Sequence, residues 1–290
     1  MGGIIDKITE FIKELLQGWV LTNLETMFTD VNDKVGTIAG EVSKTPSTWN
    51  SGIFDMIKAL SDNVMIPIAG MIISFVLVYE LISMVIDKNN LHDFNTAIFI
   101  RFFMKACIAV MLLSKTFDIV MAVFDVGSHI VNSAASAITG STSIDVASTL
   151  QTMFNEQFSE MSIGELLGLG METMIVSLCM KIMSVLITVI LYGRMIEIYL
   201  YVSVAPVPCA TVTNREWGTI GTNYFKGLCA LAFQGFFMMV CVGIYAVLVS
   251  TIQISDNMHS ALFGVAAYTV ILCFSLMKTG NLSRSIFNAH

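Results

Sequence analysis

Long apolar runs dominate this chain and restrict what it can fold into. Several of them reach or approach the roughly 20 residues that a helix needs to cross a bilayer. Hydrophobic residues make up 55% of the chain and charged residues only 13%, whereas a soluble domain carries about 25% charged residues. In lipid, backbone polar groups must be satisfied by helices or closed barrels, and continuous apolar runs select helices. The sequence therefore predicts an all-α, polytopic helical membrane protein.

Charge placement favours about five transmembrane helices, with six as the alternative. The predicted spans cover residues 64–86, 94–113 (alternatively 106–126), 171–204, 225–251 and 261–277. Splitting the 171–204 run at Tyr192–Arg194 would give six spans, but it would force the basic connector and the C-terminal tail outside. Cytoplasmic loops carry an excess of Lys and Arg, so the single long helix is preferred. The N-terminus is then outside and the C-terminus inside.

The chain is predicted to have four parts. Residues 1–61 hold an N-terminal amphipathic helix over 4–28, followed by a polar linker over 29–52 in which Gly36 and Gly40 are linker glycines despite their helix-dimer spacing. The other parts are the first two transmembrane helices at 62–115, an acidic extracytoplasmic region at 116–172, and C-terminal transmembrane helices at 173–290. The acidic region has seven carboxylates and no Lys or Arg, and it is expected to be helical, with an amphipathic helix over 117–138.

Residues 205–224, here called the connector, form the most patterned stretch of the chain. Pro206 and Pro208 are predicted to break the preceding helix because proline removes a backbone donor. A compact group of charged and aromatic residues follows at Asn214, Arg215, Glu216, Trp217 and Gly218. Arg and Trp are common at interface hot spots and also in membrane anchors. The connector is therefore either a cytoplasmic contact surface for partners or subunits, or a hairpin anchored at the bilayer.

Five charged residues fall inside predicted spans, where charge is costly and usually faces protein or water. Glu80 is expected to pair with Arg101 or Lys105, and Arg194 with Glu197 three positions later on the same helix face. Two interpretations remain open for these intramembrane contacts. They are satisfied structural pairs and interfacial side chains, or some of them line a polar path for a substrate.

Catalytic and cofactor-binding patterns are missing from the sequence. It has no P-loop, no HExxH, no GxSxG and no dinucleotide fingerprint. The six cysteines form no CxxC and lie in or beside apolar segments, and the four histidines are scattered, so no metal site is predicted. The expectation is a protein that is not an enzyme and needs no cofactor, although structural lipids are compatible with it.

Three stretches carry a resemblance to a known family: Tyr199–Pro208, Asn214–Gly218 and Phe225–Gly235. They resemble the TrbL family, the polytopic VirB-six-type subunit of type IV secretion systems, in the version found on conjugative elements of Gram-positive bacteria. The resemblance extends over most of the chain. It also implies that Trp217 matches a central Trp of the family and that Arg101 matches a basic residue early in the second span.

The resemblance implies a non-enzymatic channel or scaffold subunit in the bacterial cytoplasmic membrane. Such a subunit forms a homo-oligomer among membrane lipids, contacts other secretion subunits including cytoplasmic ATPases, and assists transfer of single-stranded DNA with its bound relaxase. The acidic region departs from what a DNA channel needs, because it cannot neutralise phosphates. The alternatives are a small-solute transporter or ion channel, for which no internal repeat is visible, and a purely structural membrane scaffold.

Overall fold

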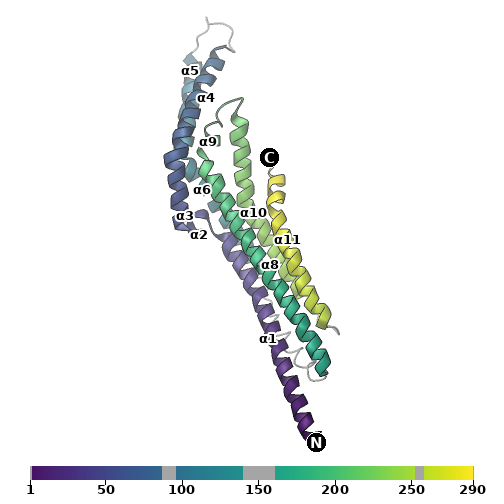
Figure 1. Cartoon of the computed structure of the whole chain (residues 1–290). Coiled ribbons are helices and arrows are strands. Elements are labelled where there is room, and N and C mark those ends of the chain that lie inside the picture. The colour runs from purple at the N-terminus through teal and green to yellow at the C-terminus, as the bar shows by residue number, and fades with distance from the viewer. Residues whose placement is uncertain (1, 87–95, 140–160, 252–257, 290) are drawn as a thin grey trace. The chain divides into compact units, whose positions relative to one another are not determined.

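A computed structural model describes residues 2–86, 96–139, 161–251 and 258–289, and these fold into a series of helices (Figure 1). The elements are α1 Gly2–Ser43, α2 Pro46–Trp49, α3 Ser51–Leu60, the π-helical η1 Ser61–Met65, α4 Ile66–Ile86, α5 Thr96–Ser114, α6 Thr116–Thr139, α8 Ile163–Val204, α9 Pro206–Cys209, α10 Gly218–Ser250 and α11 Met258–Ile286. The predicted all-α class is confirmed.

Five helical stretches within the described residues are long and apolar enough to cross a membrane. They are Ser51–Ile86, Thr116–Ile138, Ile163–Val204, Gly218–Ser250 and His259–Ile286. The predicted number of spans is confirmed. The second of the five, however, is α6, for which the sequence predicts an amphipathic helix of the acidic region. The predicted second span, 94–113, corresponds to α5, which is not among the five.

The long apolar run before the connector is one helix. Helix α8 extends without a break over 42 residues, about 63 Å at 1.5 Å per residue. Position 193, where two short spans would have to turn, lies within it. The helix ends at Val204, and Pro206 and Pro208 form the short α9, in line with proline's preference for the first turn of a helix.

Helix α1 is longer than the sequence predicts. The residues from 29 to 43, expected to be linker, continue the helix to Ser43, and Gly36 and Gly40 lie exposed on its surface. Glycine lowers helix stability by only about 1 kcal/mol per residue, and here Ile38 and Val42 are fully buried. Packing therefore overrides the weak helix propensity of this segment, because tertiary contacts supply most helical stability in proteins.

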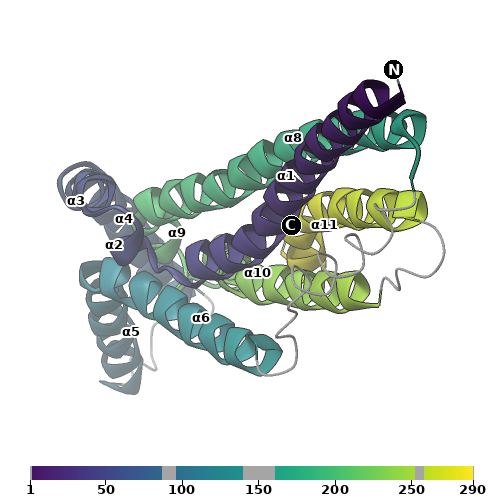
Figure 2. The same cartoon turned by 90° about the horizontal axis from the view of Figure 1, so that it is seen from below.

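The described chain divides into two compact units, and several helices contribute to both. The first unit consists of residues 1–42, 132–191 and 237–278. Within it α1 lies along the N-terminal part of α8 (Figure 2), where the Asn23 amide donates to the Thr173 hydroxyl at 3.3 Å. The Trp19 ring lies against Gly170, at a position where any larger residue would overlap it. Helices α10 and α11 are joined by the buried pair Tyr245 and Thr269, whose hydroxyls are 3.0 Å apart.

The second unit consists of residues 43–131, 192–236 and 279–290, and it contains the connector. Its core joins α3, α6, α8, α9 and α10 through a cluster of buried side chains that includes Phe117, Val120, Tyr199 and Leu228. The Tyr199 hydroxyl donates to the carbonyl of Pro46 at 2.7 Å. The core therefore fixes the end of α8 from which the connector departs.

Candidate functional site: a polar hollow between the first helix pair and the connector

Small residues bring the connector onto α4 and α5. Ala69 of α4, Ala109 of α5 and Ala210 of the connector are buried together, with Ile73 and Leu113 beside them. Alanine lets helix backbones approach closely, which is how helices commonly associate in membranes. The connector is therefore not a free loop, because its first half is packed against the first helix pair. Its residues from Gly218 onward already belong to α10.

Asn214 organises the turn that leads into α10. Its side-chain oxygen accepts hydrogen bonds from the backbone N–H groups of Glu216 at 2.8 Å and Trp217 at 2.9 Å. N–H groups at the start of a helix have no carbonyl partner within it, and Asn is among the best residues for capping them. The backbone carbonyl of Asn214 also accepts from the N–H of Gly218 at 3.0 Å. One side chain thus sets the direction in which Trp217 leaves the turn.

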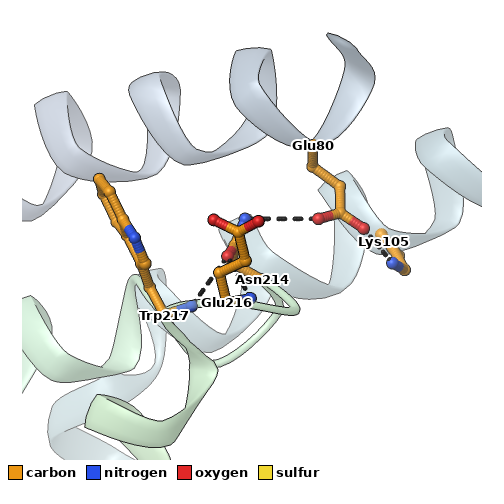
Figure 3. A network of polar contacts seen from close by, with 5 residues as sticks. All are labelled: Glu80, Lys105, Asn214, Glu216 and Trp217. Carbon is orange, nitrogen blue, oxygen red and sulfur yellow. Dashed lines mark hydrogen bonds and ion pairs between the residues drawn. The ribbon is translucent and has the colours of Figure 1, made fainter. Parts of the chain in front are cut away.

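The other end of the same Asn214 amide reaches a buried carboxylate on α4 (Figure 3). Its side-chain nitrogen donates to one oxygen of Glu80 at 3.3 Å, and the other Glu80 oxygen pairs with the ammonium group of Lys105 on α5. Glu80 is only 5% exposed. A carboxylate buried this deeply needs both a counter-ion and hydrogen bonds to offset its lost hydration. Glu80 therefore joins α4, α5 and the connector at one point.

Trp217 and Glu216 hold the turn against the preceding part of α4. The Trp217 ring stacks on two rings of α4, that of Phe75 at a centroid distance of 5.5 Å and that of Tyr79 at 6.3 Å. The Tyr79 hydroxyl donates to the Glu216 carboxylate at 2.8 Å. Trp217 nevertheless remains 39% exposed. Part of the Trp217 side chain is thus available to a partner or to lipid, while its stacking on α4 holds it in place.

These side chains border an open hollow with a volume of about 910 Å³. It is lined by Tyr79, Glu80, Ser83, Met84, Ile100, Arg101, Met104, Lys105, Asn214, Arg215 and Glu216. Three of these side chains are cations and two are carboxylates, so the hollow keeps a net positive charge. Met84, Ile100 and Met104 give it an apolar wall. The arrangement suits a ligand with one anionic and one apolar part.

Most of the polar residues singled out from the sequence meet at this hollow. Glu80, Arg101, Lys105, Asn214, Arg215 and Glu216 all line it, and Trp217 adjoins it. Of the two expected partners for Glu80, the structure selects Lys105. Phe75, Tyr79 and Ser83 were missed, although their i, i+4 spacing places them on one face of α4.

The expected pair of Arg194 and Glu197 does not form. Glu197 pairs instead with Arg284 near the C-terminal end of α11. Arg194 is 7% exposed, and its Nε has no hydrogen-bond partner within the described part of the chain. Glu197 is half-exposed and faces α11, so the spacing along α8 predicts a pair that the packing between helices replaces.

Cys209 is the cysteine of the connector, and it is buried within α9. Burial raises the pKa of its thiol to about 11, although a hydrogen bond with Thr116 acts in the opposite direction. A thiol with so high a pKa stays protonated at neutral pH, and the thiolate is the reactive form. Cys209 therefore acts as a small core residue, as expected for cysteines in apolar segments.

Comparison with protein families gives one match over most of the chain. The family model described as "TrbL/VirB6 plasmid conjugal transfer like protein" matches residues 31–206. The chain belongs to this TrbL/VirB6-like family. The match includes α4 and α5, with Glu80, Arg101 and Lys105, but it ends before Asn214–Gly218 and Phe225–Gly235, two of the three stretches that carry the resemblance in sequence. Searches of curated proteins and of solved structures find no match.

Family membership and the five apolar helices together identify a multi-pass membrane component of a conjugal transfer apparatus. TrbL/VirB6-like proteins are structural components of type IV secretion complexes and act together with other subunits. In this chain the hollow and the connector pack on α4, which lies inside the matched region.

Proposed function

We propose that this chain is a non-enzymatic channel or scaffold subunit of a conjugative type IV secretion system, located in the bacterial cytoplasmic membrane. It assists the passage of single-stranded DNA with its bound relaxase, while cytoplasmic ATPases supply the energy. It acts as a homo-oligomer and needs no cofactor. The family match over residues 31–206, coinciding with the helices that build the hollow, is the observation that carries this proposal.

The geometry of the connector supports a role in contacting partners. Asn214, Glu216 and the stacked Trp217 ring fix the turn to α4, while Trp217 stays partly exposed. An aromatic side chain held rigidly and left partly exposed loses little conformational entropy when a partner binds, which is typical of interface hot spots. The basic residues beside it favour the cytoplasmic side by the positive-inside rule, where the ATPases would be.

Two other functions compete with this one. A small-solute transporter would place broken helices and a substrate site near the middle of the bilayer, whereas α8 and α10 continue unbroken for 42 and 33 residues. A purely structural scaffold would share every feature described above but would never touch the transferred DNA. The unbroken helices disfavour the transporter. An experiment distinguishes the pure scaffold from a subunit that contacts the transferred DNA.

The test has two arms in a conjugative element that carries this gene. Clean deletion should abolish transfer, and expression of the wild-type chain in trans should restore it; transfer at the original frequency after deletion would refute the proposal. In the second arm, formaldehyde crosslinking during mating and precipitation of the tagged chain should recover the transferring strand. Intact transfer without recovered DNA would make the chain a scaffold.

A further inference from the structure

We infer that the hollow between α4, α5 and the connector is a binding site for an anionic phospholipid, with the headgroup phosphate at Arg101 and Arg215 and an acyl chain along Ile100 and Met104. The inference goes beyond the proposed function, because it concerns a resident lipid rather than the transferred substrate. It rests on the charges, the apolar wall and the place of the hollow on the helix pair.

The three cations of the hollow differ in the groups that surround them. Lys105 is taken up by Glu80, whose second oxygen receives the Asn214 amide. Arg101 lies exposed on α5, and within the described part of the chain it pairs with no carboxylate. Arg215 comes from the connector and lines the same hollow. A guanidinium presents paired donors that match phosphate oxygens, so a phosphate here would join α5 to the connector.

The apolar wall favours a phospholipid over other phosphate-containing ligands as the occupant of the hollow. Met84, Ile100 and Met104 line the hollow beside the arginines, and Ile100 and Met104 are 59% and 57% exposed. Further exposed apolar side chains lie on both helices, namely Ile82, Val85 and Ile86 on α4 and Phe99, Phe103 and Ile108 on α5. A free phosphate or a DNA backbone would leave this surface unused, whereas an acyl chain would cover it.

The position of the hollow also suits a headgroup. Its lining comes from the first turns of α5 and from the last turns of α4, which closes the candidate span Ser51–Ile86. The ends of spanning helices are where headgroups lie. Side chains of Arg near such ends extend toward the interface. The net positive charge of the hollow fits a lipid with one negative charge, such as phosphatidylglycerol, better than zwitterionic phosphatidylcholine.

The test measures lipid retention by the purified full-length chain. Native mass spectrometry from mixed micelles of phosphatidylglycerol and phosphatidylcholine should show a retained phosphatidylglycerol, and Arg101→Gln should reduce its retention about tenfold, since a charge-assisted contact is lost. Lys181→Gln removes one exposed cation from α8 and serves as the matched control, with unchanged retention. Equal retention by wild type and Arg101→Gln, or equal loss in both variants, would overturn the inference.

Competition and crosslinking identify the source of the phosphate without relying on a variant. Neither inorganic phosphate nor a single-stranded oligonucleotide should displace phosphatidylglycerol; displacement by either one would assign the hollow to a free anion or to DNA and refute the lipid site. A phosphatidylglycerol with a photoactivatable acyl chain should crosslink to wild-type peptides that contain Ile100 or Met104. Crosslinks confined to other helices would also refute it.

Discussion

The Asn214 side-chain amide donates to the Glu80 carboxylate at 3.3 Å, although the two residues lie 134 positions apart in the sequence. The contact ties the turn that precedes α10 to the last turns of α4 (Figure 3). Because Lys105 holds the other Glu80 oxygen, three segments depend on one carboxylate. Substitution of Glu80 should therefore weaken the packing of the connector on α4 as well as the packing between α4 and α5.

Glu80→Ala should destabilise the chain more than Glu80→Gln. The alanine variant leaves Lys105 and Asn214 without their acceptor, whereas glutamine keeps one acceptor oxygen, which can receive a hydrogen bond from one of these two donors. The expected difference from wild type for Glu80→Ala is about 1–3 kcal/mol, toward the lower end because the Lys105 side chain is 38% exposed. Thermal unfolding in detergent measures it. Equal melting temperatures for Glu80→Ala and wild type would contradict the account of Glu80 as a junction.

Asn214→Ala should loosen the entry to α10. It removes the acceptor for the N–H groups of Glu216 and Trp217, a loss of about 1 kcal/mol for a capping residue. Hydrogen exchange should accelerate at these two amides while the amides in the middle of α10 stay protected. Asn214→Asp keeps the acceptor, so hydrogen exchange at the amides of Glu216 and Trp217 should stay slow. It also places a second carboxylate beside Glu80, so the stability of the chain should fall. Unchanged exchange in Asn214→Ala would exclude the cap.

Exchanging the charges of Glu197 and Arg284 should restore the stability that reversing either charge alone removes. The pair is partly exposed, with side chains 36% and 42% accessible, so each reversal should cost about 1 kcal/mol or less. The double variant Glu197→Arg/Arg284→Glu should unfold near the wild-type temperature. Rescue of Glu197→Arg by Arg194→Glu instead would reinstate the pair along α8 that the sequence suggests.

Thiol labelling tests the topology. In a background without reactive cysteines, new cysteines near Ser141 and Asp256 should react with an impermeant reagent from outside, and one at Thr213 should not. A cysteine at Lys115 should behave like the one at Thr213, because Leu113 packs in one cluster with Ala210 of the connector. Native Cys209 should stay unreactive, since its thiol pKa is about 11. Labelling of position 115 alone from outside would instead make α5 the second crossing helix.

Much of the fold was predictable because lipid permits few structures. Continuous apolar runs specify helices whatever their neighbours are, which is why the helical class follows from the sequence. The placement of Lys and Arg then favours five spans and an unbroken α8. The segment before Ser43 was misjudged, because burial of Ile38 and Val42 decides its structure. Local propensity carries no information about such burial.

The candidate site was predictable in its residues but not in its geometry. Costly charges inside apolar helices pointed to Glu80, Arg101 and Lys105, and the pattern of the connector pointed to Asn214–Gly218. That these two groups meet depends on close packing at Ala69, Ala109 and Ala210, and nothing in a single sequence links positions so far apart. The same limit explains Arg284, whose pairing with Glu197 bridges two helices.

Transfer frequency with Trp217 variants tests the central claim most directly, namely that the connector is where this chain contributes to conjugal transfer. In a deletion strain, Trp217→Ala should lower transfer about tenfold or more, in the range of a hot-spot loss, while membrane levels stay normal. Trp217→Phe should keep most transfer, and Phe263→Ala, which removes an exposed aromatic ring from α11, should leave it unchanged. Transfer at wild-type frequency with Trp217→Ala would contradict the account.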